Sequence, residues 1–390
     1  MKVYDVCMIG SGASGGMSAN VLTKPGLDCV MLEAGPMKPV SQFPTHRIRR
    51  WDLPGRGLKG DYFQEWLTQT GFLADQAKEP YSEAGKNHFA FWRVRAVGGK
   101  SLFWAAVTPR FGPEEFQPLD DYDTKWPLTY DEVAPFYDRV EELIGVSSTV
   151  QSVGAFPLNK GLAPFAPKPA ELEMTKACES LNCGPCWQGC DSGSKFDSLH
   201  VFLLAARNTG RLNLVPNARV RNLELGADGK IKAVHYFDVE KREWQELQAK
   251  SFALCAGAIE TSHILLTSKI ANFSGLIGRY LSEHLYASVG GHLPQLMGRK
   301  IANEDGSGAH VFVLFQGEVL PYKDNRIELD PVVKDDAGIP VPKFFYEWHD
   351  NEGAMFKDMI EVGNEILQKA GAMRSSERMV NLMKNNTWKD

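Results

Sequence analysis

The segment YDVCMIGSGASGG constrains the fold more than any other part of the chain. Residues 6–9 form an apolar run that predicts a buried strand, and residues 29–32 form a second one. Between them, Gly10, Gly12 and Gly15 give the pattern G-x-G-x-x-G, and a helix is predicted directly after the last of these glycines. The N-terminus is therefore predicted to fold as a βαβ unit with a glycine-rich turn after its first strand.

The three glycines and a later carboxylate together indicate a dinucleotide site. The glycines allow a tight turn, close approach of the backbone to a diphosphate, and close packing of helix on strand. The helix N-terminus offers free N–H groups to the phosphates. Glu33 lies 23 residues after Gly10, where a carboxylate can accept hydrogen bonds from ribose hydroxyls, and its charge disfavours a 2′-phosphate. The unit predicts FAD or NAD rather than NADP; a glycine turn without a ligand is the alternative.

A second glycine cluster occurs in RVRAVGGKSLFWAAVTPRF, at residues 93–111. Gly98, Gly99 and Ser101 would let the backbone lie flat beside a large planar ligand, and the small side chain of Ala105 would leave room for it. A loop that only packs on the first domain is the alternative interpretation.

The rest of the chain predicts ordinary secondary structure around these two motifs. Thr129 and Glu132 predict a capping box at the start of an amphipathic helix. Residues 211–268 alternate like strands and end in a second strand–turn–helix at Gly257. The C-terminal part predicts a mostly antiparallel sheet, followed by a helix that stops at Gly371. Because 390 residues exceed one ordinary hydrophobic core, two domains are expected.

Composition and charge exclude some classes of protein. The net charge is −5, which argues against a nucleic-acid-binding surface. No apolar run is long enough to cross a bilayer, so no transmembrane segment is expected. The start MKVYDVCMIG runs straight into a strand and does not look like a signal peptide. A cytoplasmic location is therefore expected, unless a partner subunit carries the chain across a membrane.

Four of the seven cysteines crowd into CESLNCGPCWQGC. They are Cys178, Cys183, Cys186 and Cys190, with the spacing C-x4-C-x2-C-x3-C. Three or four thiolates brought together can ligate an iron–sulfur cluster. A zinc ion bound by these thiolates is the second interpretation, and a structural thiol loop without a metal is the third.

Several segments, taken in order, resemble one family, the glucose–methanol–choline (GMC) flavoprotein oxidoreductases. The segments are GSGASGG with Glu33, VGGKSLFW, WPLTYDEVAPFYDRVE, CGPCWQGCDSGSK, NARVRNL, CAGAIETSHILLTS, GRYLSEH, and NRIELDP with GIPVPKF. The sugar-oxidising branch, which includes pyranose oxidases and bacterial sugar dehydrogenases, looks most similar. The resemblance runs from residue 5 to about residue 371.

The resemblance implies an α/β fold in two interleaved domains. An FAD-binding, Rossmann-like βαβ domain would comprise residues 1–45, 90–110 and 195–285. A substrate or cap domain of the α+β type, built on a mostly antiparallel sheet, would comprise residues 46–89, 111–194 and 286–390. The implied activity is oxidation of the CH–OH group of an alcohol or sugar, with hydride transfer to flavin N5.

The resemblance also implies a set of FAD-binding residues. They are Gly10, Gly12, Ser14, Gly15, Glu33, Gly98, Gly99, Ser101, Trp104, Ala105, Val220, Ala256, Gly257 and Ala258. In the pyranose-oxidase form of the second glycine loop, a histidine can bond covalently to the flavin. Phe103 occupies that position here, so FAD is expected to be bound non-covalently.

The family's catalytic histidine, with its histidine or asparagine partner, follows the last helix, and no histidine follows Gly371 in this chain. The sequence is therefore expected to lack the family's C-terminal catalytic segment, so no catalytic residue is assigned. His349 is expected to be a surface or substrate-domain residue, and His284 is expected to brace the FAD domain.

Four functions remain open. The first is an FAD-dependent alcohol or sugar dehydrogenase, with a small subunit or an electron-transfer haem protein as a possible partner. The second is an oxidase of the same fold that passes electrons to oxygen. The third is a catalytically incomplete FAD-binding fragment or paralogue. The fourth, an NAD-dependent dehydrogenase, is opposed by the second strand–turn–helix and by the interleaved layout.

Overall fold

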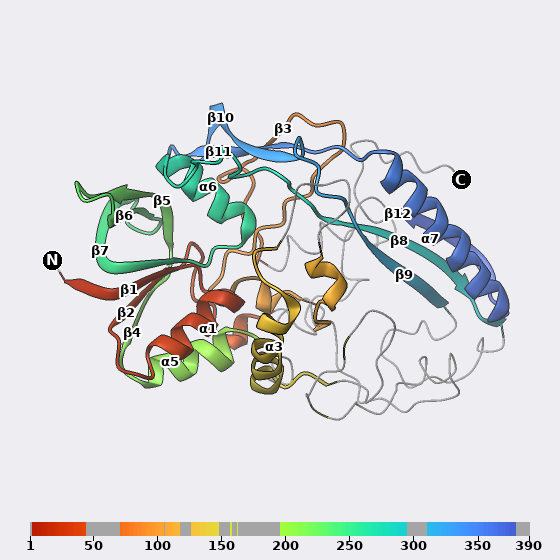
Figure 1. The fold of residues 1–390 in the computed structure, drawn as a ribbon, viewed down its shortest axis with the longest axis horizontal. Helices are drawn as coiled ribbons and strands as arrows, with labels where there is room; N and C mark the ends of the chain where they lie inside the picture. Colours follow the sequence, from red (N-terminus) through yellow and green to blue (C-terminus); the bar gives the residue numbers. More distant parts are fainter. Residues whose placement is uncertain are drawn as a thin grey trace.

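The computed structural model describes residues 2–43, 71–104, 106–117, 126–147, 157, 162, 196–294 and 310–379. Two regions stand out in Figure 1: a sheet flanked by helices near the N-terminus, and a region of long strands beside one long helix near the C-terminus. None of the helices in the described residues is long and apolar enough to span a membrane.

A six-stranded sheet forms the core of the first region, with the order β4-β2-β1-β7-β6-β5. Its strands are β1 (Val3–Ile9), β2 (Cys29–Leu32), β4 (Leu212–Val215), β5 (Ala218–Leu225), β6 (Ile231–Asp238) and β7 (Glu243–Leu254). Strand β1 pairs in parallel with both β2 and β7, and β2 pairs in parallel with β4. Strands β7, β6 and β5 form an antiparallel meander. The mixed α/β sheet confirms the predicted fold class.

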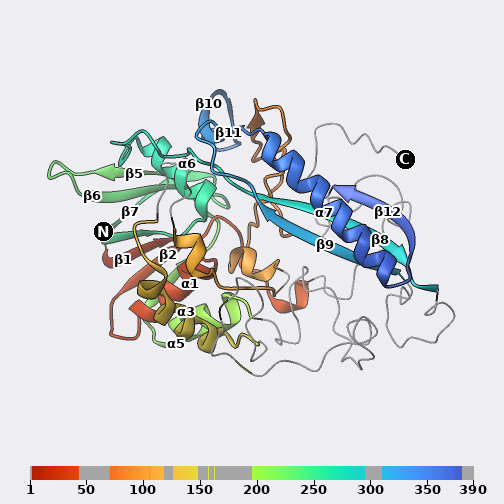
Figure 2. The same ribbon diagram turned by 45° about the vertical axis from the view of Figure 1, so that its right-hand side comes forward.

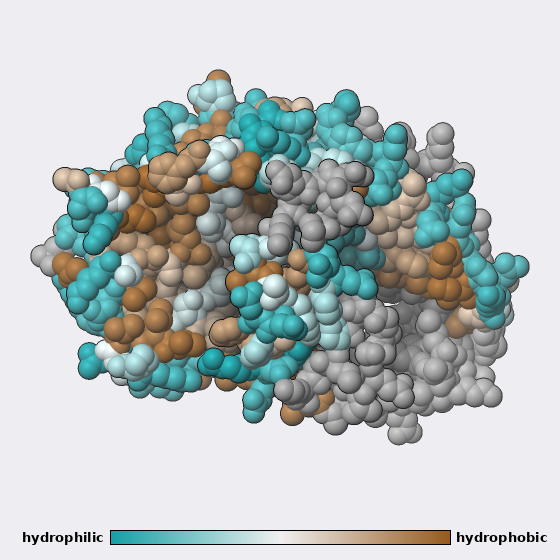
Figure 3. Space-filling model, in the orientation of Figure 1, coloured by the Kyte–Doolittle hydropathy of each residue, from teal (hydrophilic) through white to brown (hydrophobic). Residues whose placement is uncertain are grey.

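Helices cover both faces of the parallel part of this sheet. They are α1 (Ala13–Leu22), the π-turn η7 (Leu199–Leu203), α5 (Leu204–Asn208) and α6 (Ala258–Ser268). Met8 of β1 packs in one cluster with Ala19 of α1, whereas its neighbour Ile9 packs in another with Ile264 of α6. Strands buried on both faces read as continuous apolar runs, which explains why β1 and β2 could be predicted from the sequence. On the face shown in Figure 3, apolar side chains gather over this region.

The second region contains two three-stranded sheets. One has the order β12-β8-β9, from Met373–Met379, His284–His292 and His310–Glu318; the other has the order β10-β11-β3, from Arg326–Lys334, Pro340–Phe345 and Ser82–Glu83. Helix α7 (Asp350–Lys369) lies along β8 and β9 (Figure 2). Gly363 of α7 permits this close packing, because a Cβ there would lie 2.4 Å from Cγ2 of Val289.

One expectation for this region needs correction, and two further features were not predicted. The sequence predicted one mostly antiparallel sheet, but the strands divide between two, and β3 joins β11 in parallel. Strand β12 continues the chain beyond Gly371, although its sequence MRSSERM is polar; its backbone pairs with β8. His349 is the N-cap residue of α7 rather than part of a strand, and its backbone N–H donates to Glu352 at 2.9 Å.

The connecting segments include helix α3 (Tyr130–Ile144) and the 3₁₀ turns η1 (Val40–Gln42), η4 (Gly99–Leu102) and η5 (Pro113–Phe116). The predicted capping box of α3 is confirmed: the backbone N–H of Thr129 donates to Oε2 of Glu132 at 2.8 Å, and the Glu132 N–H donates to Oγ1 of Thr129 at 3.4 Å. The predicted domain boundaries stay a prediction.

Candidate functional site

A cavity of about 550 Å³ lies where β1, β2 and β7 end. In open α/β sheets, ligands bind at this carboxyl edge of the strands. The turn after β1 and the start of α1 form one wall, and the turn after β7 and the start of α6 form another. Residues 89–95 and 99–101 close the cavity from the side.

The glycine-rich turn leaves the start of α1 open to this cavity. Gly10 has a φ of +100°, which is the left-handed conformation that favours glycine. Gly12 is the N-cap residue of α1 and supplies no side-chain cap, so the first N–H groups of the helix remain available to an anion. A Cβ on Gly12 would meet nothing within 4 Å, whereas a Cβ on Gly15 would lie 1.9 Å from the carbonyl oxygen of Gly10. Gly12 therefore faces open space, and Gly15 is required for packing.

Glu33 lies at the end of β2 with only 6% of its surface exposed. Its Oε2 accepts hydrogen bonds from the N–H and the hydroxyl of Ser11, at 3.0 and 2.6 Å. Its Oε1 accepts from the N–H of Gly35 at 2.8 Å. Burial raises the pKa of Glu33, and these hydrogen bonds act in the opposite direction. The carboxyl group is thus fixed beside the turn, where the remaining lone pairs of its oxygens can accept hydroxyl donors.

Three serines connect the glycine turn to the second glycine loop. Oγ of Ser11 accepts the N–H of Gly98 at 2.9 Å, and Oγ of Ser101 donates to the carbonyl of Gly98 at 2.6 Å. Ser198 donates its N–H to Oγ of Ser101 at 2.7 Å and its hydroxyl to the carbonyls of Ser11 and Gly12, both at 3.0 Å. The second glycine loop is therefore held against the start of α1.

A network of buried charges supports the opposite wall. Nη2 of Arg95 lies 2.6 Å from Oε2 of Glu79 and 2.9 Å from Oε1 of Glu260. Arg219 reaches the same Glu79 at 3.3 Å and also pairs with Asp335 at 2.8 Å. The network joins the six-stranded sheet, through β5, to the hairpin between β10 and β11.

The charge of Glu260 makes this network sensitive to acid. Burial by itself would raise the pKa of Glu260, but the charge of Arg95 and the hydrogen bond from His263 outweigh it and hold the pKa of this carboxyl well below its usual range. A carboxyl group whose pKa is lowered by folding stabilises the fold above its unfolded pKa, and this contribution is lost as the pH falls toward the folded pKa.

The free energy of unfolding is therefore expected to fall as the pH drops below the ordinary glutamate value of 4.5, partly through Glu260. Urea unfolding of the wild type and Glu260→Gln at several pH values measures this. The variant should be less stable at neutral pH and should show a shallower loss in acid. Glu365→Gln, at an exposed ion pair of α7, serves as the control. Equal pH slopes for the wild type and Glu260→Gln would contradict the assignment.

Lys100 differs from the other cations of the cavity wall. Arg93, Arg95 and Arg219 each pair with a carboxylate within 4.0 Å, but among the described residues Lys100 has no such ion pair. Burial lowers the pKa of Lys100, although its side chain has substantial accessible surface. The two observations agree because the side chain lines the cavity, so neighbouring atoms surround it while the cavity leaves its surface accessible.

Most residues predicted to bind FAD come together around this cavity. Those that line it are Gly10, Gly12, Ser14, Glu33, Gly99, Ser101, Val220, Ala256, Gly257 and Ala258. Gly15 and Gly98 shape the turns behind it, and Trp104 donates its indole N–H to the carbonyl of Phe196 at 3.0 Å. Ala105 and the cluster Cys178, Cys183, Cys186 and Cys190 lie outside the described residues. The FAD contacts themselves stay a prediction.

The sequence analysis missed several charged residues of the cavity wall. Lys100 lies inside the second glycine motif and could have been found there. Glu283 lies next to His284 in the LSEH segment and also lines the cavity. The contact between Arg95 and Glu260 spans 165 residues, so no local sequence signal reveals it.

The cavity fits a dinucleotide such as FAD. The open space at Gly12 and the uncapped N-terminus of α1 suit a diphosphate. The fixed carboxylate of Glu33 suits a ribose. Lys100 adds a positive charge to the same cavity.

Comparison with known proteins agrees with this geometry. A family model described as GMC oxidoreductase matches residues 8–286. The chain is 24% identical, over 476 aligned positions, to 2-methyl-1,2-propanediol dehydrogenase from Mycolicibacterium austroafricanum, covering 96% of this chain and 82% of that protein. It is 25% identical to the fructose dehydrogenase large subunit from Gluconobacter japonicus, covering 72% of this chain but only 58% of that protein.

Solved structures show the same fold. Pyridoxine 4-oxidase from Mesorbium loti superposes with a TM-score of 0.60 at 17% identity, covering 98% of this chain and 84% of that chain. Formate oxidase from Aspergillus oryzae superposes with a TM-score of 0.60 at 14% identity, covering 96% of this chain and 83% of that chain. With the family model matching from β1 to the start of β8, this chain belongs to the GMC oxidoreductase family of FAD-binding enzymes.

Proposed function

We propose that this chain is an FAD-dependent oxidoreductase that oxidises the CH–OH group of an alcohol or sugar to a carbonyl, acting as a dehydrogenase. The observation that carries the proposal is the cavity at the ends of β1, β2 and β7, with the open start of α1 and the carboxylate of Glu33 beside it. The similar proteins named as dehydrogenases of a diol and of fructose support this class of substrate.

The chain's own residues would hold FAD along the cavity. Glu33 would accept hydrogen bonds from the ribose hydroxyls, and the N–H groups after Gly12 would bind the diphosphate. Lys100 would bring its positive charge to the same anionic group. Val220 would lie against the adenine. Gly257, the uncapped N-cap residue of α6, would provide the second turn of the pocket.

FAD would supply the acceptor for a hydride from the alcohol carbon, and the chain would have to supply a base for the hydroxyl proton. The described residues that line the cavity include no histidine. His349 serves as the N-cap of α7, with its ring 4.0 Å from that of Tyr322. In the dehydrogenase, the base would therefore come from outside these lining residues; the second candidate function is a catalytically incomplete FAD-binding member of the family.

Non-covalent binding of FAD is part of the proposal. Phe103 has no nucleophilic atom, and its side chain is 8% exposed in a cluster with Phe43 and Phe72. A flavin bound beside it would therefore be released by denaturation.

The proposal also includes an iron–sulfur cluster at the four cysteines, and a small subunit or haem protein as electron acceptor. Similarity to proteins named as a large subunit and as a flavoprotein supports a partner of this kind.

The test is an absorption spectrum of the purified chain in the absence of oxygen, followed by addition of single alcohols and sugars. Flavin bands that bleach with one substrate would support the dehydrogenase. Rapid return of the colour on admission of oxygen would instead identify an oxidase. A broad additional brown absorption would indicate an iron–sulfur cluster.

Two further outcomes separate the remaining alternatives. Stable flavin bands that no alcohol or sugar bleaches would support the catalytically incomplete protein. A folded, colourless protein that does not take up added FAD would contradict the proposal altogether. Acid precipitation provides the control for covalent linkage, because non-covalent flavin stays in the supernatant.

A further inference from the structure

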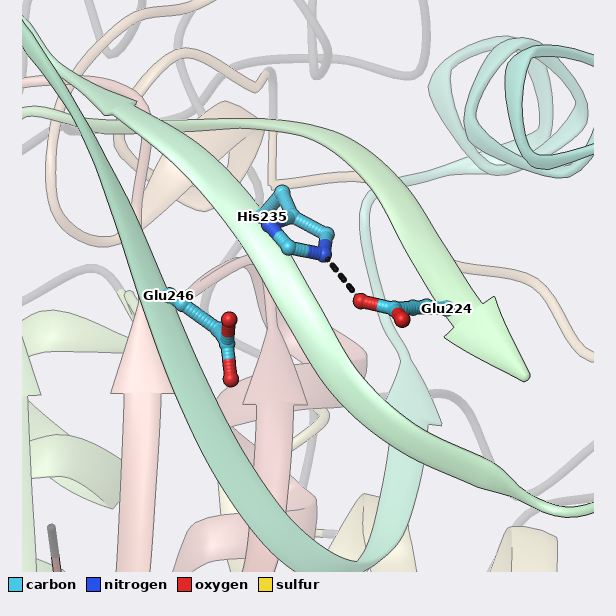
Figure 4. A group of neighbouring side chains, drawn as sticks. All are labelled: Glu224, His235 and Glu246. Atoms are coloured by element: carbon cyan, nitrogen blue, oxygen red, sulfur yellow. Dashed lines mark hydrogen bonds and ion pairs between the residues drawn. The ribbon is translucent and has the colours of Figure 1, made fainter. Parts of the chain in front are cut away.

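Three metal-ligating side chains converge on the antiparallel meander, away from the cofactor cavity. They are Glu224 of β5, His235 of β6 and Glu246 of β7 (Figure 4). His235 lies directly opposite Glu246 in the register. Glu224 lies opposite Ala233, so it is the diagonal neighbour of His235 on the same face. The sheet itself therefore holds the three side chains together.

The distances suit a single small ion. One possible ligand atom from each residue lies within 4.8 Å of the others, and Nε2 of His235 lies 2.7 Å from Oε2 of Glu224. Ligand atoms around a tetrahedral zinc ion lie roughly 3–4 Å apart, because the bonds are about 2.0–2.2 Å long. The three groups thus need only small side-chain rotations to surround an ion.

The side chains that now contact Glu224 and Glu246 would compete only weakly with a divalent ion for the carboxylate oxygens. Nζ of Lys232 lies 2.6 Å from Oε1 of Glu224, but the Lys232 side chain is 54% exposed. Ion pairs at such exposed positions contribute little to stability. Gln248 donates to Oε1 of Glu246 at 3.0 Å, which leaves Oε2 available. The hydrogen bond from Lys232 and that from His235 hold the pKa of Glu224 below its usual range.

We propose that Glu224, His235 and Glu246 bind a zinc ion that links β5, β6 and β7, with water in the fourth position. A mixed set of imidazole and carboxylate ligands favours zinc over magnesium or calcium, which prefer oxygen ligands alone. The ion would cross-link the meander whose first strand carries Ala218 and Val220 into the cofactor cavity. The site is independent of the oxidoreductase function.

The test is metal titration of the full chain after removal of metal, with the thiols first alkylated so that the four-cysteine cluster cannot bind. Addition of zinc should raise the thermal midpoint by about 2–4 °C. Cobalt should bind at one site and give a spectrum without the charge-transfer band of a thiolate ligand. Calcium should give no comparable rise.

Variants then assign the site. His235→Ala and Glu246→Gln should each weaken zinc binding by at least about 10–100-fold, because mutation of a residue that only supports a ligand already costs this much. Glu243→Gln, on the exposed start of β7 outside the cluster, should bind zinc like the wild type. Glu246→Gln keeps the test decisive if His235→Ala does not fold, because Glu246 is exposed. Binding weaker than about 1 mM, or unchanged affinity in both ligand variants, would overturn the proposal.

Discussion

Gly15→Ala is expected to lose FAD binding and stability together. The new Cβ would lie 1.9 Å from the carbonyl oxygen of Gly10, and this is backbone that cannot rotate away. Either α1 must move from the turn or the turn must open, and such overpacking costs about 1–3 kcal/mol. Since 1.4 kcal/mol corresponds to a factor of ten in affinity, we expect FAD binding to weaken by about ten- to a hundred-fold. Fluorescence titration with FAD and thermal unfolding of the apoprotein measure the two effects.

Gly12→Ala is the matched variant, because it should separate the two effects. Its Cβ would meet nothing within 4 Å, and the φ of Gly12 is −64°, which alanine adopts readily. The apoprotein should therefore unfold like the wild type, while the methyl group occupies the space in which a diphosphate would approach α1. Wild-type FAD affinity in Gly12→Ala would show that the diphosphate does not bind here. Equal loss of stability in both variants would contradict the packing role of Gly15.

Arg95→Met is expected to lower the free energy of unfolding by about 3–5 kcal/mol, because it removes the arginine that pairs with the buried Glu260 and one of the arginines that pair with Glu79. The side chains of Arg95, Glu79 and Glu260 are only 16%, 10% and 18% exposed, so water cannot replace the lost charge. Methionine keeps much of the volume, and the effect therefore reports charge rather than packing. Urea unfolding at neutral pH measures it.

Two comparisons show whether the network acts as described. Lys86→Met removes an ion pair with Glu347 in which the lysine is 83% exposed, and it should change stability by no more than about 0.5 kcal/mol. In the double variant Arg95→Met/Glu260→Gln, the loss in free energy of unfolding should be smaller than the sum of the losses in the two single variants. The reason is that the second change removes a carboxylate whose pairing the first change disrupts. Full additivity, or a loss in Arg95→Met no larger than in Lys86→Met, would contradict the buried network.

The parts of the fold that the sequence predicted well are those fixed by neighbours in the chain. The turn at Gly10 and the capping box at Thr129 depend on residues a few positions apart, and the βαβ unit lies within residues 3–32; the structure confirms all of them. The apolar runs of β1 and β2 were readable because both faces of these strands are buried.

The parts that could not be predicted depend on distant contacts. The strands of the second region alternate in the same way whether they form one sheet or two, so their division between two sheets has no sequence signal. The polar strand β12 is specified by backbone pairing with β8 rather than by an apolar pattern. The position of His349 at the start of α7 follows from the capping role of Glu352, which is 1% exposed.

In the candidate site, too, the features set by local sequence were predicted, and those set by distant contacts were not. The residues that must be glycine, and the acid at the end of β2, were identified because their chemistry requires those types at that spacing. The cations of the cavity wall escaped prediction, since arginine and lysine are usually surface residues and only tertiary contacts bring Arg93 and Arg219 to the same Glu79.

The serine connection at the turn also determines when the cofactor pocket can form during synthesis. The hydroxyl of Ser198 bonds to carbonyls that lie 187 and 186 residues earlier, so the ribosome must add all of these residues before the turn is closed. At about 5–20 residues per second this takes on the order of 10–40 s. Until then the glycine turn and β1 lack Ser198 as a partner, and β4 and β7 are added later still. A cofactor pocket held by this bond can therefore form only late in synthesis, after Ser198 has been added.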